Sequence, residues 1–185
     1  MFYKISVITT IALLLNSKSF SQVPPNIIIP TENNIYSNAY FVDNNINKFV
    51  GTWRWVSGND TVLIALKKTK RTIEFPPYTY FEDMLYGCNT YIKNGQLVFS
   101  TMQFINSPNL SNYNIAGGSN YQDSTKANLI FGDRPKKRRH NLILQFIAGT
   151  PNKLSWHTNG REGACIEPCP PPGFTLPRDM ILTKQ

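Results

Sequence analysis

Two adjacent carboxylates, Glu82 and Asp83, are the side chains in this sequence best suited to general acid–base chemistry. Glycoside hydrolysis, for example, needs two carboxyl groups that face each other about 5 to 10 Å apart. Neighbouring strand residues point to opposite faces unless a β-bulge intervenes, so this pair predicts a bulge or an exposed bend rather than a catalytic dyad. The sequence also has no phosphate-binding glycine loop and no Gly-x-Ser-x-Gly elbow. We predict no catalytic residue, with an unrecognised hydrolase as an alternative.

Three cysteines, Cys88, Cys165 and Cys169, and two histidines, His140 and His157, are the candidates for nucleophilic or metal chemistry. Three residues separate Cys165 from Cys169, where redox motifs have two, and both histidines are distant in sequence. We therefore predict no metal, no cofactor and no Cys–His hydrolase. In an oxidising compartment we expect a Cys165–Cys169 disulfide on a Pro-rich loop. A bridge from Cys88 to either loop cysteine is the competing arrangement.

A basic cluster surrounds Pro135 and consists of Arg134, Lys136, Lys137, Arg138 and Arg139. This concentration of positive charge fits an anion-binding patch for an acidic envelope polysaccharide or a lipid. No aromatic residues are interleaved with the charges for base stacking, which argues against nucleic acid. The competing interpretation is the solvated tip of a hairpin, and the sequence favours it.

Aromatic residues offer another route to ligand binding. Trp53 and Trp55 share one face of a predicted strand, and a tyrosine series follows at Tyr78, Tyr80, Tyr86 and Tyr91. Rings that combine apolar area with a polar tip suit sugars and lipids. Packing inside and around a barrel explains the same residues and is the interpretation we prefer.

Short β-strands must position all of these residues. Apolar and alternating runs predict strands over 51–56, 61–74, 78–93, 96–104, 127–131, 141–148, 154–158 and 179–184. Most connections are short enough for antiparallel neighbours, and 106–124 is the exception, a long polar loop containing Gly117-Gly118. We predict an all-β fold: a single antiparallel barrel or strongly curved sheet of about eight strands, lipocalin-like in outline.

The dipeptide Asn94-Gly95 predicts a tight hairpin turn, because both residues tolerate a positive φ. The resulting register places Ile92 opposite Leu97 and Cys88 opposite Thr101. We expect an interior face shared by Cys88, Ile92, Leu97 and Phe99, which would bury the thiol.

The first 21 residues predict a secretory signal peptide. An apolar run from Ile5 to Leu15 follows Lys4, and Ser19 and Ser21 precede the expected cleavage before Gln22. The run is too short to span a bilayer. We expect an exported protein in the periplasm, on the outer surface or outside the cell.

The expected mature chain begins with an extended Pro- and Asn-rich arm over 22–47, followed by the barrel domain over 48–185. Loss of Lys4 and Lys18 would lower the formal net charge from +8 to +6, so the mature protein stays basic.

Four segments carry a family resemblance: Phe49-Val-Gly-Thr-Trp53, Tyr80-Phe-Glu-Asp-Met-Leu-Tyr-Gly87, Tyr91-Ile-Lys-Asn-Gly95 and the terminal Leu176–Gln185. Together they resemble a family of small exported bacterial proteins catalogued as a domain of unknown function, over Phe49 to Gln185. The Gly51-Thr-Trp53 element is similar to the Gly-x-Trp opening of lipocalin-like barrels, where the glycine turns the chain into the first strand and the tryptophan closes one end. That likeness implies structural roles for Gly51 and Trp53. The family has no assigned activity, so the resemblance implies no catalytic residue.

The sequence thus predicts a non-enzymatic binding or envelope-interaction module. The alternative is a lipocalin-like carrier, in which the barrel interior would hold a small apolar ligand.

Overall fold

The structure is a computed structural model that describes residues 38–159, 168 and 173–185. Its elements are β1 (Tyr40–Phe41), the 3-10 helix η1 (Asn45–Phe49), β2 (Gly51–Ser57), β3 (Asp60–Phe75), β4 (Tyr78–Lys93), β5 (Gln96–Ser100), the 3-10 helices η2 (Met102–Phe104) and η3 (Leu110–Asn112), β6 (Ile115–Ser119), β7 (Lys126–Asp133), β8 (Arg138–Ile147), β9 (Thr150–Asn159) and β10 (Asp179–Lys184). Within these residues no helix is both long enough and apolar enough to cross a membrane.

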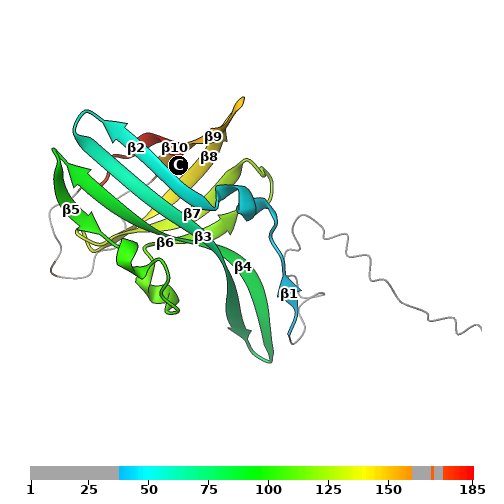
Figure 1. The fold of residues 1–185 in the computed structure, drawn as a ribbon. Coiled ribbons are helices and arrows are strands. Elements are labelled where there is room, and N and C mark those ends of the chain that lie inside the picture. The colour runs from blue at the N-terminus through cyan, green and yellow to red at the C-terminus, as the bar shows by residue number, and fades with distance from the viewer. Residues whose placement is uncertain (1–37, 160–167, 169–172) are drawn as a thin grey trace, which may run out of the picture.

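Eight strands form a closed antiparallel barrel (Figure 1). Around the wall the order is β4-β3-β2-β10-β9-β8-β7-β6, and β6 pairs back onto β4 through Leu85, Tyr86 and Gly87. The remaining two strands, β1 and β5, both attach to β4. The predicted all-β barrel of about eight strands is confirmed.

A continuous apolar core occupies the inside of the barrel. Alternation sends Val62, Ile64 and Leu66 of β3 inward, and the opposite wall contributes fully buried residues such as Leu144 and Trp156. One end is covered by η1, whose Ile46 and Phe49 have no exposed surface.

Gly51 and Trp53 lie beside η1 at this covered end. The φ of Gly51 is +131°, and a Cβ on this residue would lie 3.1 Å from Cε of Lys184, so glycine suits the turn into β2. The Trp53 indole is fully buried and its Nε1 donates to the carbonyl of Phe49 at 2.8 Å. Nζ of Lys184 lies 5.2 Å from the ring centroid. These contacts tie the first and last strands of the wall to η1.

One wall strand, β6, lies inside the segment 106–124 that the sequence predicts as a loop. Its core is Gly117-Gly118, and glycine normally weakens a strand. Gly117 is required here because a Cβ would lie 2.3 Å from the carbonyl oxygen of Asn128 on β7. The predicted strand 96–104 is also too long, since β5 ends at Ser100 and η2 follows.

The predicted facing of the β4–β5 hairpin is wrong in part. A bulge between Tyr91 and Ile92 places Phe99 opposite Tyr91, and Leu97 is 64% exposed. Cys88 is buried as expected, but in a second cluster with Tyr86 and Tyr113 that lies outside the wall, beneath the loop carrying η2 and η3.

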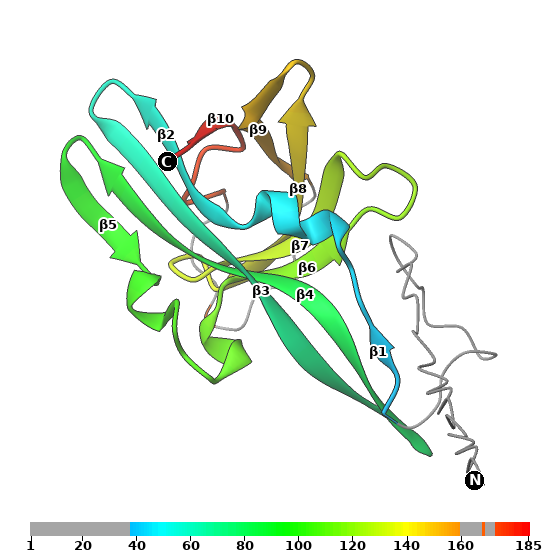
Figure 2. The same ribbon diagram turned by 45° about the vertical axis from the view of Figure 1, so that its right-hand side comes forward.

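The β3–β4 hairpin extends well beyond the barrel, as both ribbon views show (Figures 1 and 2). Its ladder continues to the pair Phe75 and Tyr78, whereas β6 reaches β4 only at Leu85–Gly87. The projecting part is joined by β1, which runs parallel to β4 at Phe81 and Glu82.

The wall has a weak seam between β2 and β10. Five residue pairs join β10 to β9, but only Thr183–Arg54 and Lys184–Trp53 join it to β2. Beyond those pairs lies a hollow of about 510 Å³, lined among others by Trp55, Val56, Met180 and Ile181.

Candidate functional site

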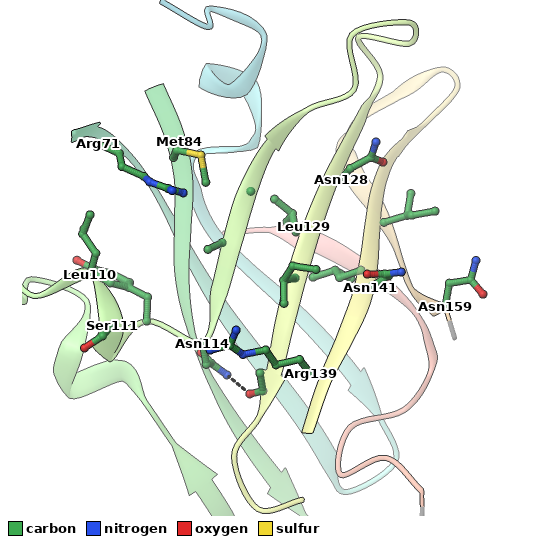
Figure 3. A pocket seen from close by; sticks show the side chains of 17 residues that line it. Arg71, Met84, Leu110, Ser111, Asn114, Asn128, Leu129, Arg139, Asn141 and Asn159 are labelled. Carbon is green, nitrogen blue, oxygen red and sulfur yellow. Dashed lines mark hydrogen bonds between the residues drawn. The ribbon is translucent and has the colours of Figure 1, made fainter. Parts of the chain in front are cut away.

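A hollow of about 710 Å³ lies on the outside of the barrel, over β6, β7 and β8. We call it the outer groove, and Figure 3 shows the side chains that line it. Arg71 and Met84 of the projecting hairpin border it on one side, and Leu110 and Ser111 of η3 lie near them. The opposite side is formed by Asn128 of β7 and by Arg139, Asn141 and Ile143 of β8.

Small residues make this part of the wall hollow. β6 presents Ala116 and Gly118 outward, and β7 presents Gly132 beside Arg139. With almost no side chains rising from these positions, the surface between the hairpin and β8 stays low. The glycines of β6 therefore have two effects: they prevent its prediction as a strand from the sequence, and they leave room for the groove.

Asparagine amides line the floor and far side of the groove together with apolar side chains such as Ile130 and Ile143. Asn128 and Asn141 are exposed on neighbouring strands, and Asn159 pairs directly with Asn141. Each exposed amide offers donors and an acceptor. Asn114 also lines the groove but is committed to the fold: it donates to Asn89 and to the carbonyl of Gly132, and its Oδ1 accepts from Thr101 at 3.0 Å.

A second hollow of about 610 Å³ continues from the outer groove, since Ser111, Asn114, Gly132 and Arg139 line both. We call it the basic hollow, because its lining includes Arg134, Lys137, Arg138 and Arg139. It lies between the β7–β8 turn and the loop carrying η3.

The β7–β8 turn leans on this loop instead of projecting freely. Arg134 donates to the carbonyl of Asn112, and its guanidinium lies 5.5 Å from the ring centroid of Phe104. Lys137 takes a φ of +50° and its N–H donates to the carbonyl of Arg134 at 3.0 Å, which closes the turn. Arg134, Lys137 and Arg139 nevertheless remain exposed to solvent.

Few carboxylates of the described residues line the two hollows. The outer groove has Arg71 and Arg139, and none of the described residues in its lining is a carboxylate. Asp133, the acid that lines the basic hollow, is fully buried and accepts from the N–H and Oγ1 of Thr175 at 2.7 and 2.6 Å. In the part of the chain that the structure describes, no carboxylate lies within ion-pair distance of Arg139.

Arg71 has one carboxylate neighbour, Glu82, at 4.0 Å on the adjacent strand. Burial raises the pKa of Glu82, and Arg71 opposes this rise. The pair is long and partly exposed, and Arg71 also hydrogen-bonds with Tyr86 while it borders the groove.

The structure brings together four of the five basic residues singled out in the sequence. Arg134, Lys137, Arg138 and Arg139 line one hollow, whereas Lys136 does not line it. The expected disulfide partners Cys165 and Cys169 lie outside the described residues.

Of the two adjacent carboxylates, Asp83 anchors the arm, and the bulge or exposed bend predicted at this pair is absent, because the β3–β4 ladder continues past both residues. Asp83 is buried and accepts from Tyr40 Oη at 2.6 Å and from the N–H of Asp43 at 3.0 Å, and Nζ of Lys68 lies 2.6 Å away. Glu82 instead pairs with Arg71. Both acids border a hollow of about 290 Å³ with Asp43, but the described residues contain no group of three or more His, Cys, Asp or Glu side chains placed to hold a metal.

Cys88, the described cysteine, lies apart from both histidines. It is outside the wall, while His140 is buried inside it, 4.4 Å from the ring centroid of Phe174. His157 forms a surface pair with Asp179. Cys88 therefore forms no Cys–His pair with either histidine.

The Cys88 thiol is expected to resist alkylation in the folded protein. Burial raises its pKa, so little thiolate forms near neutral pH and the reagent cannot reach it. Peptide mapping after iodoacetamide treatment should show modification at Cys88 about a hundredfold slower in buffer than in urea. Equal rates in the two conditions would contradict the buried placement.

Sequence reasoning misses Arg71 and the asparagines of the groove. The available signal was modest: on β7 and β8, Asn128 and Asn141 alternate with inward Leu129 and Leu142. Such alternation marks an outward face but does not reveal that β6 and the hairpin flank it.

Comparison with known proteins gives one family. A family model described as "Family of unknown function (DUF6705)" matches residues 3–185, a longer stretch than the resemblance over Phe49–Gln185. No curated protein and no solved structure matches the chain. The function therefore has to be argued from the geometry above.

Proposed function

We propose, for a chain that belongs to this family of unknown function, that the protein is a non-enzymatic binding module whose outer groove and basic hollow hold an acidic polysaccharide. The proposal rests on two joined hollows on the outer surface, which are lined by Arg71, Arg134, Lys137 and Arg139. The carboxylate that the described residues contribute to this lining is Asp133, which is buried and hydrogen-bonded to Thr175.

The chemistry of the surface suits an acidic glycan. Guanidinium groups bind carboxylate or sulfate through two parallel hydrogen bonds. The amides of Asn128, Asn141 and Asn159 can donate to and accept from sugar hydroxyls between the charged groups. Two joined hollows over neighbouring strands of the barrel wall fit an extended polymer better than a small compact ion.

Export, which the leader-like first 21 residues favour, is part of the same proposal, since it would bring the protein into a compartment in which acidic polysaccharides are present. The formal net charge of +6 that would remain after loss of Lys4 and Lys18 favours association with polyanions at low ionic strength.

The test uses polygalacturonate, a sugar polymer with a carboxylate on each residue, and neutral dextran as the control ligand. Arg139→Ser is expected to weaken polygalacturonate binding about tenfold, because a charge-assisted contact at the junction of both hollows is lost. Isothermal titration calorimetry at low and high salt measures the affinity, which should fall steeply with salt for the native chain.

Arg54→Ser is the matched variant, since Arg54 is exposed on β2 and is separated from β8 by β9 and β10 in the wall. It should bind like the unaltered chain. Equal loss in both variants would mean that net charge alone governs binding, and binding of dextran would also overturn the proposal.

A second candidate, the lipocalin-like carrier, is favoured by one observation. Asn89 Nδ2 and Trp156 Nε1 are buried donors without a hydrogen-bond partner among the described residues, and they belong to β4 and β9, opposite strands of the wall. A ligand with an acceptor group could satisfy them. Against it, the interior is filled by the apolar core, including Trp53, Phe131 and Trp156.

A further inference from the structure

We infer that the projecting tip of the β3–β4 hairpin is a second attachment site, which inserts into the interfacial layer of a lipid bilayer. This site is separate from the outer groove, because its aromatic tip residues do not line the groove, although Arg71 of the stem borders it. The projection is about 23 Å long, from the seven β3 residues that follow Lys68, the partner of Leu85, at about 3.3 Å each. A tip so far from the barrel can reach a surface while the wall stays clear of it (Figure 2).

The tip is apolar where the other hairpin turns are polar. Phe75 is 55% exposed and Tyr78 is 39% exposed, and the two face each other as the last pair of the ladder. Ile73 and Tyr80 form the next pair that points to the same side. By contrast, Asn94-Gly95 and Ser57-Gly58-Asn59 occupy the turns at β4–β5 and β2–β3.

The turn itself consists of two prolines, Pro76 and Pro77, both exposed. Proline has no N–H, so this turn exposes two fewer donors than an ordinary one. An unsatisfied N–H is expensive to move out of water into a lipid environment. The tip therefore exposes aromatic side chains, and few of its backbone N–H groups would lose hydrogen bonds to water on insertion.

The stem provides charges at the depth of lipid headgroups. Lys70 is exposed and its Nζ lies 3.9 Å from the ring centroid of Phe81, and Arg71 follows it on the other face of the strand. Aromatic rings at an interface with cations above them are the usual arrangement of peripheral membrane anchors. Glu74 near the tip limits the preference for anionic lipids, so insertion of the rings has to supply most of the affinity.

The test is flotation of the purified protein with vesicles of phosphatidylethanolamine and phosphatidylglycerol. The native chain should float with the vesicles, and Phe75→Ser/Tyr78→Ser should reduce its partition coefficient about tenfold. The matched control is Leu97→Ser/Val98→Ser, because these two residues are 64% and 45% exposed beside the β4–β5 turn. The control should partition like the native chain.

A second variant reports insertion directly. Phe75→Trp should show added tryptophan emission that shifts to shorter wavelength with vesicles and is quenched by brominated acyl chains. Failure of the native chain to float, equal loss in the tip and control variants, or an unshifted Phe75→Trp spectrum would overturn the inference. Polygalacturonate binding by the tip variant should be unchanged, which separates this site from the proposed function.

Discussion

Replacement of Trp53 by alanine is expected to lower the free energy of unfolding by about 3 to 5 kcal/mol, the range for large aromatic truncations in a core. The indole has no exposed surface, and its ring contacts Phe146 edge-on at a centroid distance of 6.0 Å. The substitution also removes the hydrogen bond to Phe49 that holds η1 over the end of the barrel. Urea unfolding followed by circular dichroism measures the change.

Trp55→Ala is the control for this prediction. Trp55 lies two residues along the same strand and packs against the same core, but it is only partly buried. We expect a loss of about 1 to 2 kcal/mol. Equal losses at Trp53 and Trp55 would contradict the view that the covered end of the barrel is the better packed.

Replacement of Asp83 by alanine is expected to destabilise the fold by about 3 kcal/mol, because Lys68 would keep its charge in a largely buried position without its partner. The arm would also lose two attachments, from Tyr40 Oη and from the N–H of Asp43. Urea unfolding tests the stability. Asp123→Ala removes the partner of Lys126 in an exposed pair and should change stability little. Similar decreases in the free energy of unfolding for both variants would show that the buried Asp83 network stabilises the fold no more than an exposed ion pair does.

The same network predicts a pH dependence. The hydrogen bond to Asp83, followed by burial, raises the pKa of Tyr40 from 10.0 to about 12. Between these values the folded chain keeps a proton that the unfolded chain has lost, so the contribution is complete below pH 10 and is lost as the pH rises toward 12. In Asp83→Ala the Tyr40 pKa should return toward its ordinary value, and ultraviolet absorbance titration measures this directly.

Strands with strong apolar alternation could be predicted from the sequence, and the barrel with them. β3, β4 and β10 lie within one residue of their predicted bounds, since their patterns need only local information. β6 could not be predicted, because its glycines are explained only by the close approach of β7, a contact between distant parts of the chain. The facing of Leu97 failed for another reason: its predicted pairing with Ile92 is correct, but Tyr91 and not Ile92 points into the core, and the apolar content of the two faces does not reveal this.

The candidate site shows the same division. The charge cluster from Arg134 to Arg139 is visible in the sequence because its residues are consecutive. The groove is not visible, since it joins Arg71 of the hairpin to Asn128 and Asn141 through a strand that sequence reasoning places in a loop. The groove depends on the pairing of distant strands and on positions without large side chains, so the amino-acid composition gives little indication of it.

The seam between β2 and β10 bears on the order in which the chain folds and opens. These are the first and the last strands of the wall, so the chain between them, nearly the whole domain, forms a loop that closes when they pair. Closing so long a loop costs chain entropy, and only two residue pairs between the strands help to offset that cost. Closure is therefore a late event in folding. In the native state the reverse step is local: β10 can leave β2 while its five pairs with β9 persist, which would admit solvent beside Trp55 and Met180 without melting the remaining strands.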